Sequence, residues 1–304
     1  MIRHFLLPIV LLFSNPLLAQ QKVTQSSNRG SVASLHNQIE QIAGAAQGRV
    51  GVAAMLLETG ESVALLGDQR FPMQSVYKMP IGMAVLHLVD QGKVTLDQKV
   101  RVETIEYVSK RQHSPMRDQF PKGTDISVAE LLRYSVSESD GSASDVLMRL
   151  AGGPKPIMAY FKSLGIKDII IANTEKEIGG DNAVQYRNWA KPTEVVALLR
   201  LFQQGRGLSN SSRALLLRLM TETETGLHRL KGQLPAGTVV AHKTGTSWTV
   251  DGITAATNDV GLITLPTGQH IALAVFVSDS KADEKTREAV IAQIALATWN
   301  FWKK

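Results

Sequence analysis

A serine and a lysine at the spacing Ser75-x-x-Lys78 lie in the segment FPMQSVYKMPIGMAVLHLVDQGK, which begins at Phe71. Apolar residues recur at intervals of three and four between positions 76 and 89, which predicts a largely buried helix. Residues i and i+3 lie on one face of a helix, so the Lys78 amine can reach the Ser75 hydroxyl. The pair therefore joins a nucleophile to a possible base, and the helix N-terminus offers N–H groups to an oxyanion.

Short motifs elsewhere in the chain are needed to support this pair, because the four-residue pattern also arises by chance. A second copy, Ser278 to Lys281, follows the apolar run IALAVFV, and we interpret it as a surface turn. Two further motifs are SDG, which begins at Ser139 between two predicted helices, and KTG, which begins at Lys243 on a predicted strand. Each motif alone fits a capping turn or an ordinary strand. Together and in this order they indicate one catalytic site.

The composition limits the classes of function. The 304 residues are 44% hydrophobic, enough for one large domain or two modest ones with a packed core. The 33 basic and 27 acidic residues are interspersed, which argues against nucleic-acid binding but suits small anionic substrates. The seven His residues show neither H-x-H-x-D nor H-E-x-x-H spacing, so we expect no metal and no cofactor, and we interpret His242 as a strand residue.

The first twenty residues have the pattern of a secretory signal peptide. They combine a basic start at Arg3, an apolar core from Leu6 to Phe13, and a cleavage position near Ala19 or Gln20. The apolar core is far shorter than the roughly 20 residues that a membrane-spanning helix needs. Because the chain also lacks Cys for a lipid anchor or disulfides, we expect a periplasmic protein without a membrane anchor, stabilised by packing.

The middle of the chain carries mostly helical patterns. A first helix is predicted from a cap at Ser34 to about Ala46, and a hairpin formed by RVGVAAMLL and SVALLG follows it. Ser127 is the predicted cap of the helix SVAELLRYSV. Further helices are predicted for SASDVLMRL, for PIMAYFKSLG, and at about 193–204 and 209–222. Residues 171–190 show no sustained period, and a loop of this length is usually functional or disordered.

The last third of the chain predicts strands at about 237–247, 253–264 and 270–278 and a closing helix at about 282–302. Turn signals between these strands indicate antiparallel neighbours. The predicted fold is therefore α/β mixed, with a five-stranded antiparallel sheet flanked by the terminal helices, plus an all-helical lobe.

Residues 21–304 then form a single catalytic domain. Its sheet lobe comprises about 34–75 and 223–304, and its helical lobe comprises about 76–222. A ligand site is expected between the two lobes.

The three motifs, SxxK, SDG and KTG, resemble the signature of class A β-lactamases and penicillin-binding proteins. Longer blocks extend the likeness over the whole mature chain: FPMQSVYK, HLVDQGKVTL, VQYRNW, RLKGQLPAGTVVAHKTGTS and TAATND. The chain is most similar to the extended-spectrum branch that includes the PER and VEB types. This resemblance implies a monomeric serine β-lactamase of the β-lactamase/DD-peptidase fold that hydrolyses penicillins and cephalosporins, including oxyimino cephalosporins.

The resemblance also implies roles for individual residues. Ser75 would attack the lactam carbonyl, Lys78 would help remove its proton, and Ser139 would pass a proton to the leaving nitrogen. The substrate-binding wall would consist of Lys243, Thr244, Gly245 and Thr246, with Arg229 supplying a guanidinium near the substrate carboxylate. The N–H groups of Ser75 and Thr246 would form the oxyanion hole.

Glu175 is implied as the general base that activates water against the acyl-enzyme. Glu177 is the rival, but only Glu175 has the family's apolar residue, Ile178, three positions later. Whether Lys78 or Glu175 is the base for acylation is disputed for the family and stays open here.

Several residues depart from the family pattern. Gly141 replaces an Asn that would contact the substrate, and Gly179 replaces an Asn that helps to hold the hydrolytic water in many members. Asn173 and Asn188 stand where many members close the long loop with an ion pair. We expect a differently folded loop that leaves room for bulky oxyimino cephalosporins.

Three other classes of function compete with this interpretation. A penicillin-binding peptidase would release its acyl group slowly, and a β-lactam sensor would not turn over at all. Glu175 and the absence of a predicted anchor argue against both. A metal-dependent hydrolase is disfavoured by the scattered His residues.

Overall fold

The computed structural model describes residues 1–2 and 30–303. Apart from its first two residues, the predicted signal peptide lies outside the described residues. The helices are α1 (Val32–Ala43), α2 (Lys78–Asp90), α3 (Pro115–Gln119), α4 (Val128–Val136), α5 (Gly141–Leu150), α6 (Pro154–Ser163), α7 (Glu175–Gly180), α8 (Pro192–Gln203), α9 (Asn210–Thr221) and α10 (Glu284–Trp302). The 3₁₀ helices are η1 (Gly44–Ala46), η2 (Gln74–Tyr77), η3 (Thr104–Glu106) and η4 (Asn182–Arg187).

A five-stranded antiparallel sheet in the order β2-β1-β12-β11-β8 forms the centre of the molecule, as predicted. Its strands are β1 (Arg49–Leu56), β2 (Ser62–Leu65), β8 (Val240–Thr246), β11 (Thr257–Thr264) and β12 (His270–Ser278). Small pairings elsewhere use β3 (Phe71–Pro72), β4 (Lys99–Val102), β5 (Thr124–Ser127), β6 (Ile169–Ile170), β7 (Trp189–Ala190), β9 (Thr249–Val250) and β10 (Ile253–Thr254).

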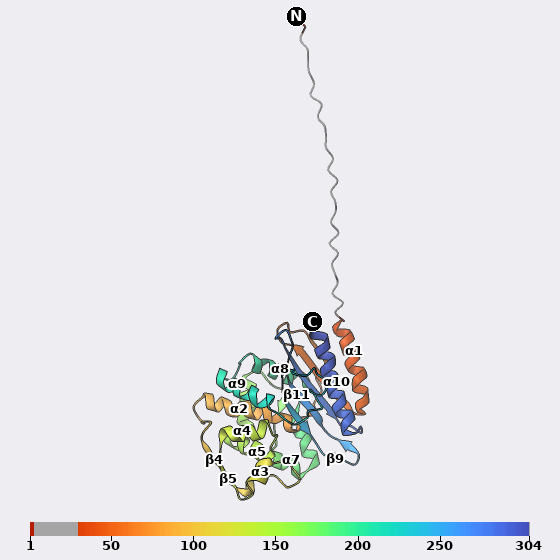
Figure 1. Cartoon of the computed structure of the whole chain (residues 1–304). Helices are drawn as coiled ribbons and strands as arrows, with labels where there is room; N and C mark the ends of the chain where they lie inside the picture. Colours follow the sequence, from red (N-terminus) through yellow and green to blue (C-terminus); the bar gives the residue numbers. More distant parts are fainter. Residues whose placement is uncertain (3–29, 304) are drawn as a thin grey trace.

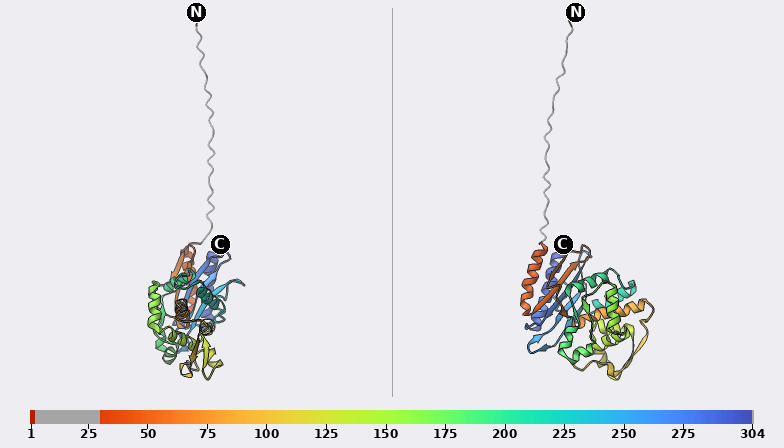
Figure 2. Two further views of the ribbon diagram at one scale, coloured as in Figure 1. Left: turned by 90° about the vertical axis from the view of Figure 1, so that its left-hand side faces the viewer. Right: turned by 180° about the vertical axis from the view of Figure 1, so that it is seen from behind.

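The sheet is covered on both faces, so its strands contribute to two hydrophobic cores. On β1, Val50, Val52 and Ala54 belong to the core beneath α1 and α10, whereas Ala53 faces the core shared with the middle helices. This alternation follows from the two-residue period of a strand. Helices α1 and α10 lie side by side on one face, and α8 packs against β1 and β12 on the other (Figures 1 and 2).

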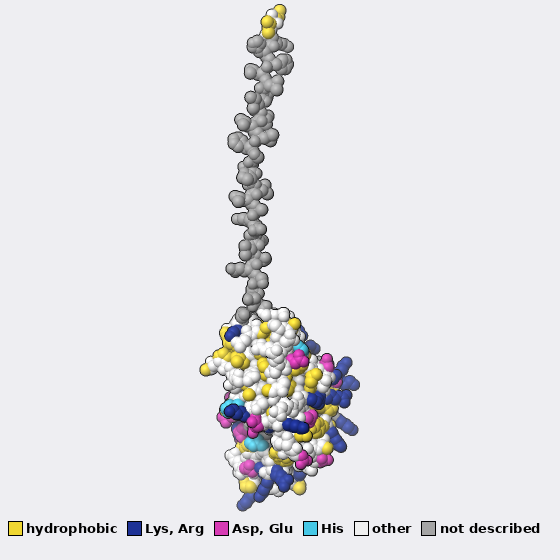
Figure 3. Space-filling model, turned by 90° about the vertical axis from the view of Figure 1, so that its right-hand side faces the viewer, with side chains coloured by type: hydrophobic (Ala, Val, Ile, Leu, Met, Phe, Trp, Pro, Cys, Tyr) yellow, Lys and Arg dark blue, Asp and Glu magenta, His cyan; other side chains and the backbone are white. Residues whose placement is uncertain are grey.

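Basic and acidic side chains are mixed on the side of α1 and α10 (Figure 3). In the described part of the chain, no helix is long and apolar enough to cross a membrane. The division into a sheet lobe and a helical lobe stays a prediction.

The structure corrects three local predictions. The cap of α1 is Ser31, which accepts a hydrogen bond from the Ser34 N–H, so the helix begins earlier than predicted. The segment 171–190 contains α7, η4 and β7, which are too short to produce a sequence period. Ser278 is not in a surface turn: it is the last residue of β12, it is buried, and its hydroxyl donates to the Ala255 carbonyl. The predicted capping of α4 by Ser127 is confirmed.

Gly51 on β1 lets the sheet approach the segment that leads to Ser75. A Cβ at this position would lie 2.3 Å from the ring of Phe71, which stacks on Phe276 of β12. We expect Gly51→Ala to lower the free energy of unfolding by roughly 1–3 kcal/mol, because the buried ring must move to admit the methyl group. Urea unfolding followed by circular dichroism measures this change.

Gly44 provides the matched control. It has helical backbone angles at the end of α1, and no atom lies within 4 Å of its Cβ position. Gly44→Ala should be neutral or slightly stabilising. Equal destabilisation by both substitutions would show that the contact with Phe71 is unimportant.

Candidate active site

Ser75 and Lys78 meet at the junction between η2 and α2. Ser75 lies within the 3₁₀ turn, Lys78 is the first residue of α2, and the Lys78 Nζ donates to the Ser75 Oγ at 2.6 Å. The lysine side chain is only 1% exposed. The predicted proximity of the two groups is therefore present, although α2 begins two residues later than the periodicity indicated.

The turn that carries Ser75 is held by strand β11 and strand β8. The Asn258 side chain on β11 donates to the carbonyls of Pro72 and Met73, at 2.8 and 3.1 Å. On β8, a Cβ at Gly245 would lie 2.3 Å from the Met73 carbonyl oxygen and 3.3 Å from the Ser75 nitrogen. Only glycine allows this approach, which brings the KTG strand against the nucleophile.

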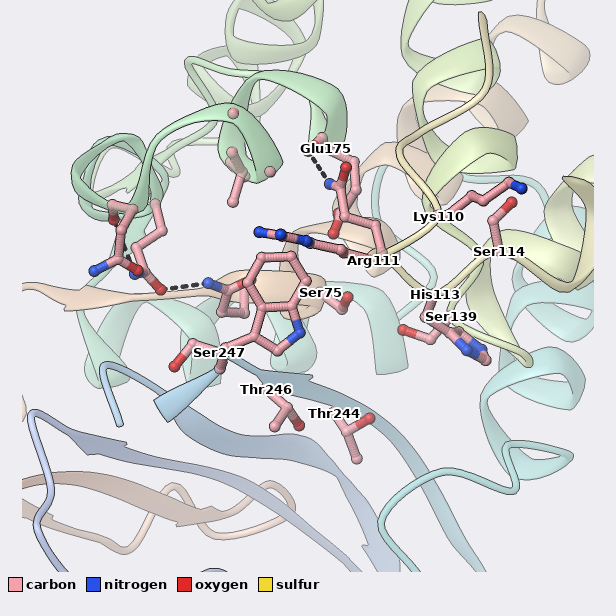
Figure 4. A pocket seen from close by; sticks show the side chains of 18 of the residues that line it. Ser75, Lys110, Arg111, His113, Ser114, Ser139, Glu175, Thr244, Thr246 and Ser247 are labelled. Atoms are coloured by element: carbon pink, nitrogen blue, oxygen red, sulfur yellow. Dashed lines mark hydrogen bonds between the residues drawn. The ribbon is translucent and has the colours of Figure 1, made fainter. Parts of the chain in front are cut away.

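Glu175 is the first residue of α7, and its side chain contacts the same lysine, Lys78, that contacts Ser75. Its Oε2 accepts a hydrogen bond from the Lys78 Nζ at 3.0 Å and another from the Tyr77 hydroxyl. Burial by itself would raise the pKa of Glu175, but the charge of Lys78 and the Tyr77 hydrogen bond hold that pKa below its ordinary value. The carboxylate is therefore ionised and lies next to both Ser75 and the cavity (Figure 4).

The rival carboxylate, Glu177, has a different environment. Its Oε2 accepts the Thr174 N–H at 2.8 Å and the Asn173 amide at 3.2 Å, completing the capping box of α7. Glu177 is exposed and does not line the cavity that contains Ser75 and Glu175. Its position suits a structural cap.

Ser139 and Lys243 form a second pair across the cavity. The Lys243 Nζ donates to the Ser139 Oγ at 2.9 Å and to the Thr244 carbonyl at 3.2 Å. Ser139 has a φ of 61°, an uncommon left-handed conformation for serine. Burial, together with the nearby charge of Lys78, holds the pKa of Lys243 well below its usual range. The amine therefore holds its proton less tightly than an ordinary lysine does, and it lies within hydrogen-bonding distance of the Ser139 hydroxyl.

Arg229 lies behind the cavity wall. It is 4% exposed, pairs with Glu288 at 3.0 Å, and donates to the Asn258 carbonyl at 3.0 Å. Its contact with the cavity passes through the Thr246 hydroxyl, which accepts from its Nη2 at 2.8 Å. Thr246 lines the cavity and Arg229 does not, so the guanidinium lies one residue behind the lining, and its role toward a substrate carboxylate stays a prediction.

The cavity between these groups has a volume of about 650 Å³. Figure 4 shows Ser75, Ser139, Glu175, Thr244 and Thr246 around it. Lys78, Lys243 and Gly245 lie immediately behind this lining, in contact with it through the hydrogen bonds and close approach described above. The remaining lining residues are Gln74, Thr225, and residues from segment 110–118, from the α7 to η4 region and from segment 247–250.

Gly141 and the pair Asn173 and Asn188, which depart from the family pattern, each have a clear structural setting. A Cβ at Gly141 would lie 2.7 Å from the Glu175 Cγ, so this glycine makes room for the carboxylate side chain. Asn188 is fully buried, and its Oδ1 accepts the N–H groups of Ala172 and Asn173 at 2.8 and 2.9 Å. The loop is thus closed by neutral hydrogen bonds at the position of the family's ion pair.

His242 is a buried strand residue whose Nδ1 lies 2.9 Å from the Asp259 carboxylate. Among the described residues, no group of three or more His, Asp and Glu side chains could hold a metal ion.

The sequence interpretation missed three residues that contact Glu175. Tyr77 donates to its carboxylate, Asp145 on α5 accepts its N–H at 2.7 Å, and Gln112 donates to its carbonyl at 2.5 Å. Burial raises the pKa of Asp145 to about 7, against the effect of two backbone N–H groups that it accepts. Tyr77 could have been suspected, since it lies between Ser75 and Lys78. No local pattern identifies the other two.

Comparisons with known proteins agree with this geometry. The model of the "Beta-lactamase enzyme family" matches residues 34–302. The extended-spectrum β-lactamase PER-1 of Pseudomonas aeruginosa is 44% identical over 88% of this chain and 87% of its own. β-Lactamase VEB-1, also of Pseudomonas aeruginosa, is 41% identical over 87% of this chain and 89% of its own.

A solved class A β-lactamase from Bacteroides cellulosilyticus superimposes with a TM-score of 0.82 at 36% identity, covering 88% of this chain and 98% of the other. A match of this extent in both sequence and structure shows the family, and the chain therefore belongs to the β-lactamase enzyme family, as a class A β-lactamase.

Proposed function

We propose that this protein hydrolyses penicillins and cephalosporins, including oxyimino cephalosporins, through an acyl-enzyme on Ser75 that is released by water activated by Glu175. The observation that carries the proposal is the shared contact of Lys78, whose Nζ touches both the Ser75 hydroxyl and the Glu175 carboxylate beside a cavity of about 650 Å³. A cavity of this size accommodates a drug-sized ligand.

In the acylation step, the Ser75 Oγ attacks the lactam carbonyl carbon and loses its proton. Either the Lys78 ammonium gives one proton to the Glu175 carboxylate and the resulting amine takes up the proton of Ser75, or Glu175 itself is the base that receives the proton. The N–H groups of Ser75 and Thr246 would stabilise the tetrahedral oxyanion, each donor typically contributing a few kcal/mol. When the C–N bond breaks, Ser139 gives its proton to the lactam nitrogen and recovers one from Lys243. The 2.9 Å contact between these two groups supports this relay.

In the deacylation step, Glu175 removes a proton from water as the water attacks the ester carbonyl on Ser75. The bond between the carbonyl carbon and the Ser75 Oγ then breaks, and the proton held by Glu175 returns through Lys78 to the Ser75 Oγ. The charged neighbours that keep the pKa of Glu175 low also keep it ionised at neutral pH, as a base must be. Lys243, Thr244, Gly245 and Thr246 form the substrate wall, and Arg229 acts on a substrate carboxylate through the Thr246 hydroxyl.

The sequence pattern of residues 1–20 supports export to the periplasm with removal of a signal peptide, and the resemblance to class A β-lactamases supports a monomer. The intact mass of the mature protein and its elution volume on size exclusion check these two assignments.

A chromogenic cephalosporin distinguishes a hydrolase from a peptidase or a sensor. We expect many turnovers for the native protein, no covalent adduct for Ser75→Ala, and a persistent acyl adduct for Glu175→Ala, with deacylation slowed about 100-fold or more. Absorbance and intact-mass spectrometry follow the two steps. A single stoichiometric adduct on the native protein would identify a peptidase or sensor, and normal deacylation by Glu175→Ala would assign the base to another group.

The Tyr77 hydroxyl lowers the pKa of Glu175, the proposed base. Burial, together with the charge of Glu175, raises the pKa of Tyr77 well above its usual value, so its hydroxyl remains a donor at neutral pH. The hydrogen bond stabilises the ionised form of Glu175 and lowers its pKa. Removing it in Tyr77→Phe raises that pKa, so deacylation is lost at a higher pH as the solution is acidified.

Single-turnover deacylation rates measured from pH 4 to 8 check this prediction. The acidic limb of the profile should move to higher pH in Tyr77→Phe, while the plateau rate changes less. An acidic limb at the native position would show that Tyr77 does not influence the ionisation of Glu175.

The loop at residues 171–190 is closed by hydrogen bonds between uncharged groups, and this supports activity on bulky substrates. Asn188 fastens Ala172 and Asn173 by hydrogen bonds alone, and PER-1 is itself named an extended-spectrum enzyme. We expect comparable kcat/KM values for oxyimino cephalosporins and for cephalosporins with small side chains. Negligible turnover of the oxyimino compounds would contradict this part of the proposal.

A further inference from the structure

We propose that Gln112 is a positioning residue for Glu175, and that its side chain occupies the space that any side chain at position 179 would need. The inference rests on the proposed function, because it takes Glu175 to be the base of deacylation.

The Gln112 carboxamide is buried and fastened at both ends. Only 7% of the residue is exposed. Its Oε1 accepts from the N–H and the hydroxyl of Ser109, at 3.2 and 3.1 Å, and its Nε2 donates to the Glu175 carbonyl at 2.5 Å. The side chain therefore forms a bridge from the Ser109 turn to the first residue of α7.

The segment that carries Gln112 is itself held in place. The Arg117 Nη1 donates to three carbonyls of this segment, those of Val108, Ser109 and Gln112, at 3.3, 2.5 and 3.1 Å. Arg117 also pairs with Asp118. A fixed anchor matters because a hydrogen bond can restrain Glu175 only if its other end does not move.

Glu175 is restrained on both sides of its backbone. Asp145 accepts its N–H at 2.7 Å and the next N–H, of Lys176, at 2.9 Å, whereas Gln112 donates to its carbonyl. Helix α7 spans only Glu175–Gly180, so it has few internal hydrogen bonds with which to define its own position. The direction of the Glu175 carboxylate therefore depends on these two outside contacts.

Gly179 completes the arrangement. A Cβ at this position would lie 2.1 Å from the Gln112 Cδ, 2.2 Å from its Oε1 and 2.4 Å from its Nε2. The backbone of Gly179 does not have a positive φ, so its conformation admits other residues. What excludes a side chain is the Gln112 carboxamide, and displacing that group would break its bonds to Ser109 and Glu175.

The contacts of Gln112 are with backbone and with Ser109, not with the Glu175 carboxylate or with Ser75. In deacylation Glu175 is the only proposed base, whereas in acylation the Ser75 hydroxyl is also in direct contact with Lys78. Acylation of Ser75 should be little affected, and deacylation should slow.

Rapid-quench kinetics with intact-mass detection measure the two steps separately. We expect Gln112→Ala to slow deacylation about tenfold, the effect of one lost hydrogen bond of ordinary strength, with acylation within about twofold of native. Gln112→Met, which keeps the length of the side chain but has no amide donor, should show the same loss. Gln91→Ala is the matched control, because Gln91 is exposed and bonds to His87 at the far end of α2.

A double-mutant comparison of positions 112 and 179 gives the sharper test. Gly179→Asn should slow deacylation at least tenfold in the native background, because the new side chain expels Gln112. In the Gln112→Ala background, Gly179→Asn should slow deacylation no further, because the carboxamide of Gln112 no longer occupies the space beside position 179. Urea unfolding of each variant confirms that it is folded; if Gln112→Ala does not fold, Gln112→Ser, whose side chain also leaves this space empty, carries the comparison.

Additive losses from the two positions, or an equal fall in acylation and deacylation, would overturn the inference. Its failure is distinguishable from failure of the proposed function. If Glu175→Ala traps the adduct while Gln112→Ala and Gln112→Met deacylate at the native rate, only the role of Gln112 is wrong. If Glu175→Ala deacylates normally, the assignment of the base is wrong.

Discussion

The ammonium group of Lys78, shared between a hydroxyl and a carboxylate, is the interaction on which the site depends. Lys78 is almost completely buried, and an unpaired charge in such a place is very costly. The carboxylate that compensates it comes from Glu175, 97 residues further along the chain. The fold must therefore bring α7 against the first turn of α2, and the same contact that neutralises Lys78 brings the Glu175 carboxylate to the cavity that Ser75 lines.

Close backbone approach makes this contact possible. Gly245 allows β8 to lie against the turn of Ser75, Gly141 leaves room for the Glu175 side chain, and Gly179 leaves room for Gln112. None of these three glycines has a positive φ, so they are not needed for unusual backbone angles. They are needed because another group already occupies the position of their Cβ. The glycine departures from the family pattern are therefore parts of a consistent local packing.

Basic side chains behind the cavity lining shape the electrostatics of the site. Three basic side chains, Lys78, Lys243 and Arg229, lie behind the cavity lining, and each is held by a different acceptor. Burial and the positive charge of Lys78 lower the pKa of Lys243, while Lys78 and Tyr77 lower that of Glu175. Both pKa values are therefore shifted downward, which favours the ionised form of the Glu175 carboxylate and weakens the hold of the Lys243 amine on its proton.

Much of the fold and several features of the site could be predicted from the sequence alone. The i, i+3 spacing of Ser75 and Lys78, the cap at Ser127, the sheet strands and the three motifs are encoded in neighbouring residues, and they predicted the family and the sheet. For the loop acid, the sequence favoured Glu175 over Glu177 through Ile178, and the tertiary structure shows that Glu175 lines the cavity and Glu177 does not. Only the tertiary structure shows that Arg229 lies behind Thr246 and that Gln112 contacts Glu175. These outcomes depend on contacts between segments separated by tens of residues, whereas periodicity and capping report only on residues within a turn or two of each other.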